Sequence, residues 1–321
     1  MDEIIKKILN KIKKNQQDSI VFNQKDKKSE EIKKEKFHDI PREKNQKKIA
    51  FVDGGNLEIL RSPSLSLFFN RIYYTIYKNN KRIQNNLVEF YTLINATEKN
   101  NKLFFSTEYF FTKNKINLKK YEFDSFDKTL VSGNRRAKIS LIGNIIRRFA
   151  ELSIINNIES DIVVIDGSLE PKYVYEKEAI ENINKDKVVC GLSKTTELLT
   201  KKGSSVSAFL NKLSEKKTWY YSAKEFFFIK LHENTKYVFR LDMMQKNKID
   251  GVLYLLKENS KDPIFLGYPY GLIEADRFAR VSKNQKKILQ LELEMKLKKD
   301  FRELLPYLAA TDAHDILDNI S

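Results

Sequence analysis

The stretch that decides the fold is DIVVIDGSL, residues 161–169, in which four β-branched apolar residues lead into Asp166 and Gly167. A run that is apolar along its whole length is typical of a strand buried on both faces of a sheet. The stretch KIAFVDGGN, residues 48–56, repeats the pattern and gives Asp53 the place of Asp166. Each Asp-Gly pair is predicted to end its strand, because glycine lets the backbone turn sharply. The sequence thus predicts two carboxylates at a sheet edge, where α/β proteins bind ligands.

The rest of the chain predicts strands first and then strands that alternate with helices. The early runs 64–78, 86–95 and 102–111 are rich in Phe, Tyr, Ile and Thr, as strands are. After a long helix at 135–155 the predicted elements are the strand 161–168, a helix near 173–184, the strand 187–194, a helix near 195–214, strands in 219–231 and 236–244, and helices in 270–297 and 309–320. This order predicts an α/β fold with a mixed sheet flanked by helices and with additional C-terminal helices.

The first 47 residues are predicted to stand apart from a folded domain at 48–321. Residues 2–15 place Ile and Leu on one helical face and Lys on the other. Such a basic helix either packs on its own domain or docks on a partner or an anionic surface. Residues 24–47 are charged and poor in apolar side chains, which is typical of a mobile tether.

The net charge and the number of cysteines limit the classes of protein to which this chain can belong. The chain has 59 Lys and Arg against 43 Asp and Glu, a net charge of +16 that favours an anionic polymer such as nucleic acid as the partner. The alternative is a lysine-rich composition without functional meaning. The single Cys190 excludes an intrachain disulfide and a CxxC zinc site. Because no apolar run reaches transmembrane length and the N-terminus lacks a signal-peptide pattern, we expect a cytoplasmic protein without membrane association.

A third acid lies close to the second Asp-Gly pair along the chain. Glu151 is near the end of the predicted helix 135–155, 15 residues before Asp166 (166 − 151). If that helix packs on the sheet, Glu151 reaches the strand ends; the alternative is a surface ion pair with Arg147. Three acids about 4 Å apart repel by roughly 4 kcal/mol per pair at an effective dielectric near 20, so they need a cation. Oxygen ligands favour Mn²⁺ or Mg²⁺, and one or two such ions suit phosphodiester hydrolysis.

Four further residues are candidates for the site. His314, in TDAHDIL, is able to bind a metal ion or move a proton, although a lone histidine on a polar helix is more often solvated. Lys194 ends the strand 187–194 and is a candidate phosphate clamp. Arg240 is a charge inside an apolar strand and needs a partner if it is buried. Arg277, in EADRFAR, belongs either to a phosphate-contacting face or to an ordinary ion-pair ladder.

The ordered set of Asp-Gly, helical Glu, VVIDGSL, GLSKT, FRLD, YPYGLIEADRFARV and DAHDIL resembles the NurA family of DNA nucleases from about residue 48 to the C-terminus. The resemblance implies an RNase H-like fold, a Mn²⁺-dependent single-strand endonuclease and 5′-to-3′ exonuclease, and a homodimer. It also implies DNA end resection and repair with a hexameric HerA-type DNA translocase. Carried over by position, Asp53, Glu151, Asp166 and His314 would be the catalytic metal ligands. The first family motif commonly has Ser where this chain has Gly55.

Two other classes of function fit parts of the pattern. Phosphotransferases of the actin and sugar-kinase kind also place two Asp-Gly turns on RNase H-like sheets, where the turns hold ATP phosphates. They normally duplicate the domain, however, and this chain is too short to repeat such a sheet. A catalytically silent nucleic-acid-binding subunit, in which the acids are only turn residues, makes the same charge prediction as a nuclease. Metal binding separates these two, since a silent subunit would not bind Mn²⁺.

Overall fold

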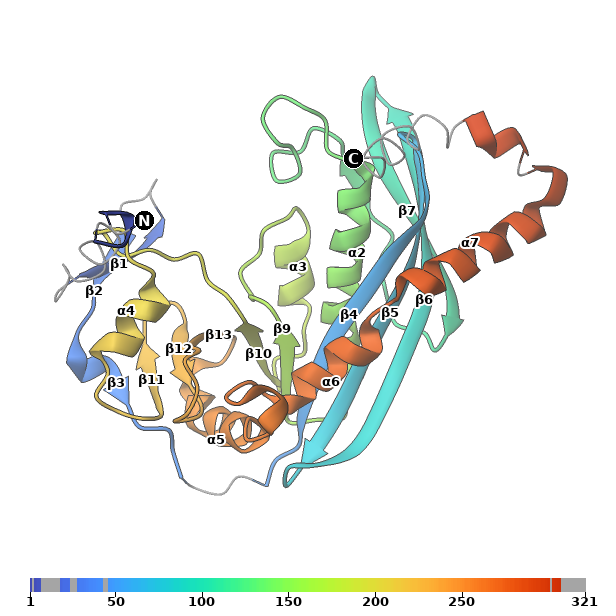
Figure 1. The fold of residues 1–321 in the computed structure, drawn as a ribbon. Coiled ribbons are helices and arrows are strands. Elements are labelled where there is room, and N and C mark those ends of the chain that lie inside the picture. The colour runs from blue at the N-terminus through green and yellow to red at the C-terminus, as the bar shows by residue number, and fades with distance from the viewer. Residues whose placement is uncertain (2, 7–17, 24–27, 43–45, 301, 307–321) are drawn as a thin grey trace.

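The computed structural model describes residues 1, 3–6, 18–23, 28–42, 46–300 and 302–306. An eleven-stranded mixed sheet runs through it (Figure 1). The strands of this sheet are β3 (Phe37–His38), β4 (Ile49–Arg61), β5 (Leu65–Lys78), β6 (Lys81–Lys99), β7 (Lys102–Lys113), β8 (Glu122–Asp124), β9 (Ile162–Asp166), β10 (Val188–Ser193), β11 (Trp219–Ser222), β12 (Phe227–Lys230) and β13 (Phe239–Met243). Their order across the sheet is β3-β11-β12-β13-β10-β9-β4-β5-β6-β7-β8.

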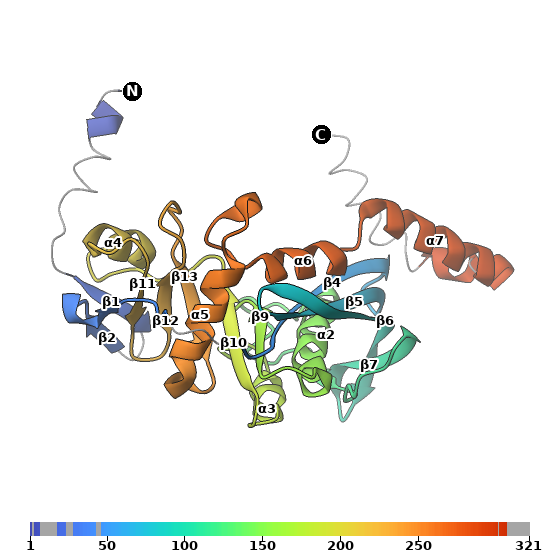
Figure 2. The same ribbon diagram turned by 90° about the horizontal axis from the view of Figure 1, so that it is seen from below.

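Helices cover both faces of this sheet. They are α2 (Ile139–Ile154), α3 (Glu176–Glu181), α4 (Val206–Leu213), α5 (Ile249–Asn259), α6 (Tyr270–Ala279) and α7 (Lys283–Leu297). Figure 2 shows α2 and α3 on one side of the central strands and α6 on the other. Among the described residues, no helix is both long and apolar enough to cross a membrane.

The centre of the sheet has the strand order of an RNase H-like fold. Strands β4, β5 and β6 are antiparallel neighbours, while β9 and β10 lie parallel to β4 on its other side. The chain reaches β9 through α2 and β10 through α3, so each parallel connection contains a helix. The predicted mixed sheet flanked by helices, and the RNase H-like fold that the family resemblance implied, are confirmed.

Successive side chains of the central strands point to opposite faces of the sheet, so a hydrophobic cluster forms on each face. Val52 and Ile165 face α2 and pack in one hydrophobic cluster with Phe149. Their neighbours Phe51 and Val164 point the other way, into a second cluster with residues of α5 and α6. Since both faces bury apolar side chains, the strands are apolar along their whole length, as the sequence pattern indicated.

The predicted tether at 24–47 is wrong for the described part of this segment. Residues Lys28–Glu31 form β2, which pairs with β1 (Ser19–Asn23), and β3 joins the large sheet beside β11. The reason is aromatic packing: the ring of Phe37 lies 5.0 Å from that of Trp219 and 4.9 Å from that of Tyr221. Phe37, together with the buried Ile32 and Ile40, thus attaches this charged segment to the sheet edge. Of the predicted helix at 2–15, residues 3–6 are helical and the others lie outside the described residues.

Three predicted elements have different bounds from those expected. The helix near 195–214 is shortened to α4, because Gly203 has a φ of +81° and ends a turn before it. The run 219–231 is a hairpin of β11 and β12, closed by a hydrogen bond from Ala223 N to Phe226 O of 3.0 Å. The helix in 270–297 is divided into α6 and α7, and Ser282 begins the second with a capping box that includes Gln285.

Candidate active site

Asp53 and Asp166 come directly after the last paired residues of two parallel strands. The pairing of β4 with β9 runs from Ile49 opposite Ile162 to Val52 opposite Ile165, so the two aspartates follow in the same register. Asp166 ends β9, and Gly167 then turns with a φ of +95°. Asp53 does not end a strand, however, since β4 continues to Arg61. The predicted turn after Asp53 is therefore wrong, whereas the turn after Asp166 is confirmed.

The glycines after Asp53 allow helices to approach the strand from both sides. A Cβ on Gly54 would lie 2.6 Å from Oε1 of Glu151, so Gly54 makes room for that carboxylate. A Cβ on Gly55 would overlap the backbone carbonyl oxygen of Ala279 in α6. Close approach, not a turn, is therefore the reason for both glycines. It also explains why a serine does not occupy position 55 in this chain.

Glu151 reaches the same place from α2. Its side chain is 3% exposed, and it forms ion pairs with Arg147 and, at 3.5 Å, with Arg148. Arg147 also donates to the carbonyl oxygen of Gly54 at 2.8 Å, which fixes α2 to β4. Both sequence interpretations of Glu151 are thus partly right: the ion pair with Arg147 exists, but it is buried beside the strand ends.

The charges of the three acids act on one another. The pKa of Asp53 is raised to about 8, first by burial and then by the neighbouring charges of Glu151 and Asp166. Burial also raises the pKa of Glu151, with a further contribution from Asp166, although Arg147 and Arg148 oppose the shift. The arginines therefore do not fully compensate the buried negative charge.

Asp166 is held by two groups from other elements. Lys194, the residue after β10, donates to Oδ2 of Asp166 at 2.7 Å, and the hydroxyl of Tyr268 lies 3.4 Å from Oδ1. The amine of Lys194 also lies 5.5 Å from the centre of the Tyr268 ring. Burial and the charge of Asp166 both raise the pKa of Tyr268, so its hydroxyl remains a proton donor at neutral pH. The structure therefore brings Lys194 to the predicted site.

The three acids supply the oxygen donors that a divalent cation binds, but their side chains are not arranged around one position. Among the described residues, no group of three or more His, Cys, Asp or Glu side chains is arranged to hold a metal ion. The carboxylates of Glu151 and Asp166 are instead paired with Arg147 and Lys194. Within the described residues, the carboxylate of Asp53 forms no ion pair, and it accepts from Gly54 N at 2.7 Å. Oxygen donors with uncompensated negative charge are what Mn²⁺ and Mg²⁺ bind.

The loop after Asp166 is fixed by a separate charged cluster around Asp242 of β13. Asp242 accepts from Ser168 Oγ at 2.7 Å and from Leu169 N at 2.9 Å. Arg240 binds Asp242 at 2.8 Å and Glu170 at 3.1 Å, and stacks 4.0 Å from the Phe226 ring. The predicted need of Arg240 for a partner is confirmed. Its described partners hold the loop, and none of them is one of the three acids.

Of the last two predicted residues, Arg277 is described by the structure and His314 is not. Arg277 of α6 is exposed. In the same helix, Glu274 accepts from Tyr73 of β5 at 3.0 Å and pairs with Arg82 of β6. His314 lies outside the described residues, so its predicted role as a ligand stays a prediction.

The sequence interpretation missed Tyr268, Arg148 and Asp242. Asp242 stands two residues after Arg240 in FRLDM, and this pairing of opposite charges in an apolar strand was the available signal. Tyr268 lies in the loop before α6, where no local pattern marks a residue that contacts a strand over a hundred positions earlier. Arg148 directly follows Arg147 in the sequence, and only its position around the helix axis distinguishes the two. No local signal marks its contact with Glu151.

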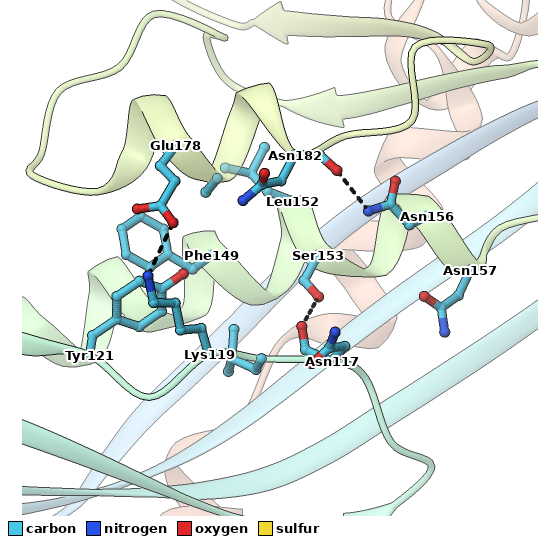
Figure 3. Close-up of a pocket in the computed structure, with 12 residues that line it drawn as sticks. Asn117, Lys119, Tyr121, Phe149, Leu152, Ser153, Asn156, Asn157, Glu178 and Asn182 are labelled. Carbon is cyan, nitrogen blue, oxygen red and sulfur yellow. Dashed lines mark hydrogen bonds and ion pairs between the residues drawn. The ribbon is translucent and has the colours of Figure 1, made fainter.

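A separate pocket of about 460 Å³ lies between α2, α3 and residues 117–121. Figure 3 shows Lys119 and Glu178 at its side, joined at 3.1 Å, with Phe149 and Tyr121 among its aromatic residues. None of Asp53, Glu151 and Asp166 lines this pocket. It is therefore distinct from the acid cluster.

Fold and site together define an RNase H-like α/β protein in which the buried Asp53 and Glu151 and the half-buried Asp166 lie at the ends of its parallel strands. The NurA domain model matches residues 47–281, so the chain belongs to the NurA family of nucleases. A sequence search of curated proteins gave no match.

Solved structures with a similar chain path are more distant. Ciona intestinalis endonuclease V, in complex with a DNA containing inosine, is 10% identical with a TM-score of 0.38, over 75% of this chain and 87% of that one. Human endonuclease V is 9% identical with a TM-score of 0.40, over 76% and 86%. Marinitoga piezophila Argonaute, with guide RNA and target DNA, is 11% identical with a TM-score of 0.34, over 80% and 32%. Scores this low assign no residue and no activity, so the family rests on the sequence match.

Proposed function

We propose that this protein is a metal-dependent DNA nuclease whose centre is formed by Asp53, Glu151 and Asp166. The observation that carries the proposal is the position of Asp53 and Asp166 in one register of two parallel strands, with Glu151 beside Gly54. Burial, and then the charges of Glu151 and Asp166, raise the pKa of Asp53 to about 8, and a bound Mn²⁺ or Mg²⁺ would relieve this unfavourable charge. One or two such ions would stabilise the attacking and leaving oxygens in phosphodiester hydrolysis.

The surrounding residues have separate tasks in this proposal. Lys194, now paired with Asp166, would move to a DNA phosphate and neutralise it when a metal ion takes its place at the carboxylate. Tyr268 would keep Asp166 oriented through its hydroxyl. Arg147 and Arg148 would hold Glu151 in place beside β4. The net charge of +16 supports a polyanionic substrate, whose binding should weaken with salt.

The finer points of the proposal rest on the family. We propose a single-strand endonuclease and 5′-to-3′ exonuclease that acts in DNA end resection and repair, as a homodimer with a hexameric HerA-type DNA translocase. His314 would add a fourth ligand to the three acids. Oligonucleotides labelled at the 5′ or the 3′ end distinguish the polarity of digestion by which end yields the labelled mononucleotide first.

The decisive test uses the full chain, single-stranded DNA and Mn²⁺. We expect cleavage by the wild-type protein and a loss of at least 100-fold in Asp53→Asn and Asp166→Asn. The exposed Asp186 provides the matched control, and Asp186→Asn should cleave like the wild type. Mn²⁺ should also raise the melting temperature of the wild type and not that of Asp166→Asn. Full activity of Asp166→Asn would contradict the mechanism, and a wild type that neither cleaves nor responds to Mn²⁺ would identify a silent DNA-binding subunit.

A further inference from the structure

A polar stripe on α2 leads away from the acids. Ser140, Asn144, Arg147 and Glu151 are spaced by four, three and four residues, so they share one face of the helix. Arg147 contacts Gly54, and Asn144 accepts from the Asn56 side chain at 3.1 Å. As the chain advances along β4, the contacts therefore move toward the start of α2. Figure 1 shows the two elements side by side.

A basic pocket lies at the far end of this stripe. It has a volume of about 540 Å³, and Arg135, Arg136 and Lys138 line it together with Ser140 and Asn144. The three cationic side chains are exposed. Within the described ranges, no ion pair or side-chain hydrogen bond is found for any of them. This contrasts with Arg147, Arg148 and Lys194, which are all paired with acids.

The lining of the basic pocket indicates which part of a nucleic acid it contacts. Its other residues are Leu130, Ser132, Ala137 and Leu141, and no aromatic ring is among them. Single-stranded bases are usually bound by stacking on aromatic side chains, whereas phosphates are bound by Arg, Lys and small polar groups. The pocket therefore fits the DNA backbone and not a base.

The helix also sets the distance between the basic pocket and the acids. Ser140 and Glu151 are 11 residues apart (151 − 140), which corresponds to about 16 Å along α2 at 1.5 Å per residue. One strand in duplex geometry advances about 3.4 Å per nucleotide and covers this distance in about five nucleotides. An unstacked single strand is more extended, so five nucleotides is the upper bound. Arg147 and Glu151 of the stripe pack against β4, but Asn144, which lies between them and Ser140, is exposed. A strand that passes Asn144 is therefore able to reach both sites.

We propose that the basic pocket binds a backbone phosphate of the substrate strand within about five nucleotides of the phosphate at the acids. It thereby sets the shortest DNA strand that the protein binds well. The proposal rests on the proposed function in one respect only, namely that the acids mark where the strand is cleaved.

The test compares binding of short and long strands in a chelator, so that no cleavage occurs. The probes are fluorescein-labelled oligothymidylates of 4 and 12 nucleotides, and the variant is Arg135→Gln/Arg136→Gln/Lys138→Gln. For the triple variant, we expect the 12-mer to bind about tenfold more weakly than it binds the wild type, and the affinity for the 4-mer to be nearly unchanged. The salt slope for the 12-mer should fall by roughly 0.7, because one phosphate contact is lost. The single variant Arg136→Gln should show a smaller change in the same direction, and circular dichroism checks that both variants are folded.

The matched control removes the same charge at the other end of α2. Lys113, Lys115 and Lys120 are exposed and belong to the segment whose Asn117 carbonyl accepts from Ser153 Oγ at 2.7 Å. Their triple change to Gln should leave the ratio of 12-mer to 4-mer affinity at the wild-type value. The proposal is overturned if folded pocket variants keep wild-type affinity for the 12-mer, or if the control loses as much. Cleavage with Mn²⁺ is measured in a separate experiment. If the wild type does not cleave DNA, the proposed nuclease function is overturned. A dependence of binding on strand length in the chelator would still support the proposal for the basic pocket.

Discussion

Gly54 of β4 and Glu151 of α2 are in such close contact that a single methyl group would not fit between them. A Cβ on Gly54 would lie 2.6 Å from Oε1 of Glu151 and 2.7 Å from Cδ1 of Ile72. The absence of a side chain at one position on a strand therefore determines where a carboxylate from a helix is placed. In the proposed nuclease, this contact brings the helical acid to the two strand aspartates.

Gly54→Ala should remove most of the activity. The added methyl group would push Glu151 away from Asp53 and Asp166, and we expect cleavage to fall more than tenfold, with a loss of about 1–3 kcal/mol of stability from overpacking. Kinetics with single-stranded DNA and urea unfolding measure the two effects. Gly203→Ala is the control: no atom lies within 4 Å of its Cβ, so its strained φ of +81° should reduce stability alone. Equal activity of Gly54→Ala and the wild type would show that Glu151 is not needed.

Gly55→Ser restores the residue that is usual in the family and should nevertheless harm this protein. The new Cβ would overlap the carbonyl oxygen of Ala279, a backbone atom that cannot move aside without shifting α6. We expect a loss of about 1–3 kcal/mol in the free energy of unfolding, measured with urea. A variant as stable as the wild type would mean that α6 is free to shift away from β4.

The metal-free protein should lose stability as the pH rises. The pKa of Asp53 is about 8 in the folded protein against 3.8 as the ordinary value, so the folded state binds the proton more tightly than the unfolded state. Stability is therefore fully present near pH 4 and is lost progressively toward pH 8, by an amount on the order of a few kcal/mol. Melting temperatures in a chelator at pH 6 and pH 9 measure this slope. Asp53→Asn should flatten it and be the more stable protein at pH 9, whereas Asp186→Asn should keep it.

Asp242→Ala should disturb the site without touching the acids. The change releases Ser168 and Leu169 and leaves Arg240 without a partner in β13. We expect a loss of about 3–5 kcal/mol, typical of breaking a buried ion pair from one side, together with lower activity because the loop after Asp166 is freed. Ser168→Ala removes one hydrogen bond and should cost only about 1 kcal/mol. If the two variants were equally stable, Asp242 would not be the anchor of this loop.

Much of the fold followed from local patterns. The β-branched runs at 48–53 and 161–166 predicted two buried strands, and the long amphipathic run predicted α2. The N-terminal segment was misjudged because its attachment depends on Phe37 meeting Trp219 and Tyr221, which are over 180 positions away. The structure brings Lys194 to Asp166 and places Glu151 and Asp166 near enough to Asp53 to raise its pKa, while the role of these residues as a catalytic site stays a prediction. The pairing of Asp242 with Arg240 had a local signal in FRLDM, whereas the contacts of Asp242 with Ser168 and Leu169 and that of Tyr268 with Asp166 are tertiary.

The sequence by itself determined which strands are buried, which acids are near their ends and to which family the chain belongs. These follow from the order and chemical nature of neighbouring residues, and burial on both faces requires apolar runs. Only the tertiary structure decided that β4 continues through Gly54 and Gly55, and that these glycines admit Glu151 and α6. An Asp-Gly pair has the same local preference for a turn in both stretches. Packing of helices against β4 overrides it at Asp53, whereas at Asp166 β9 ends and the turn is formed.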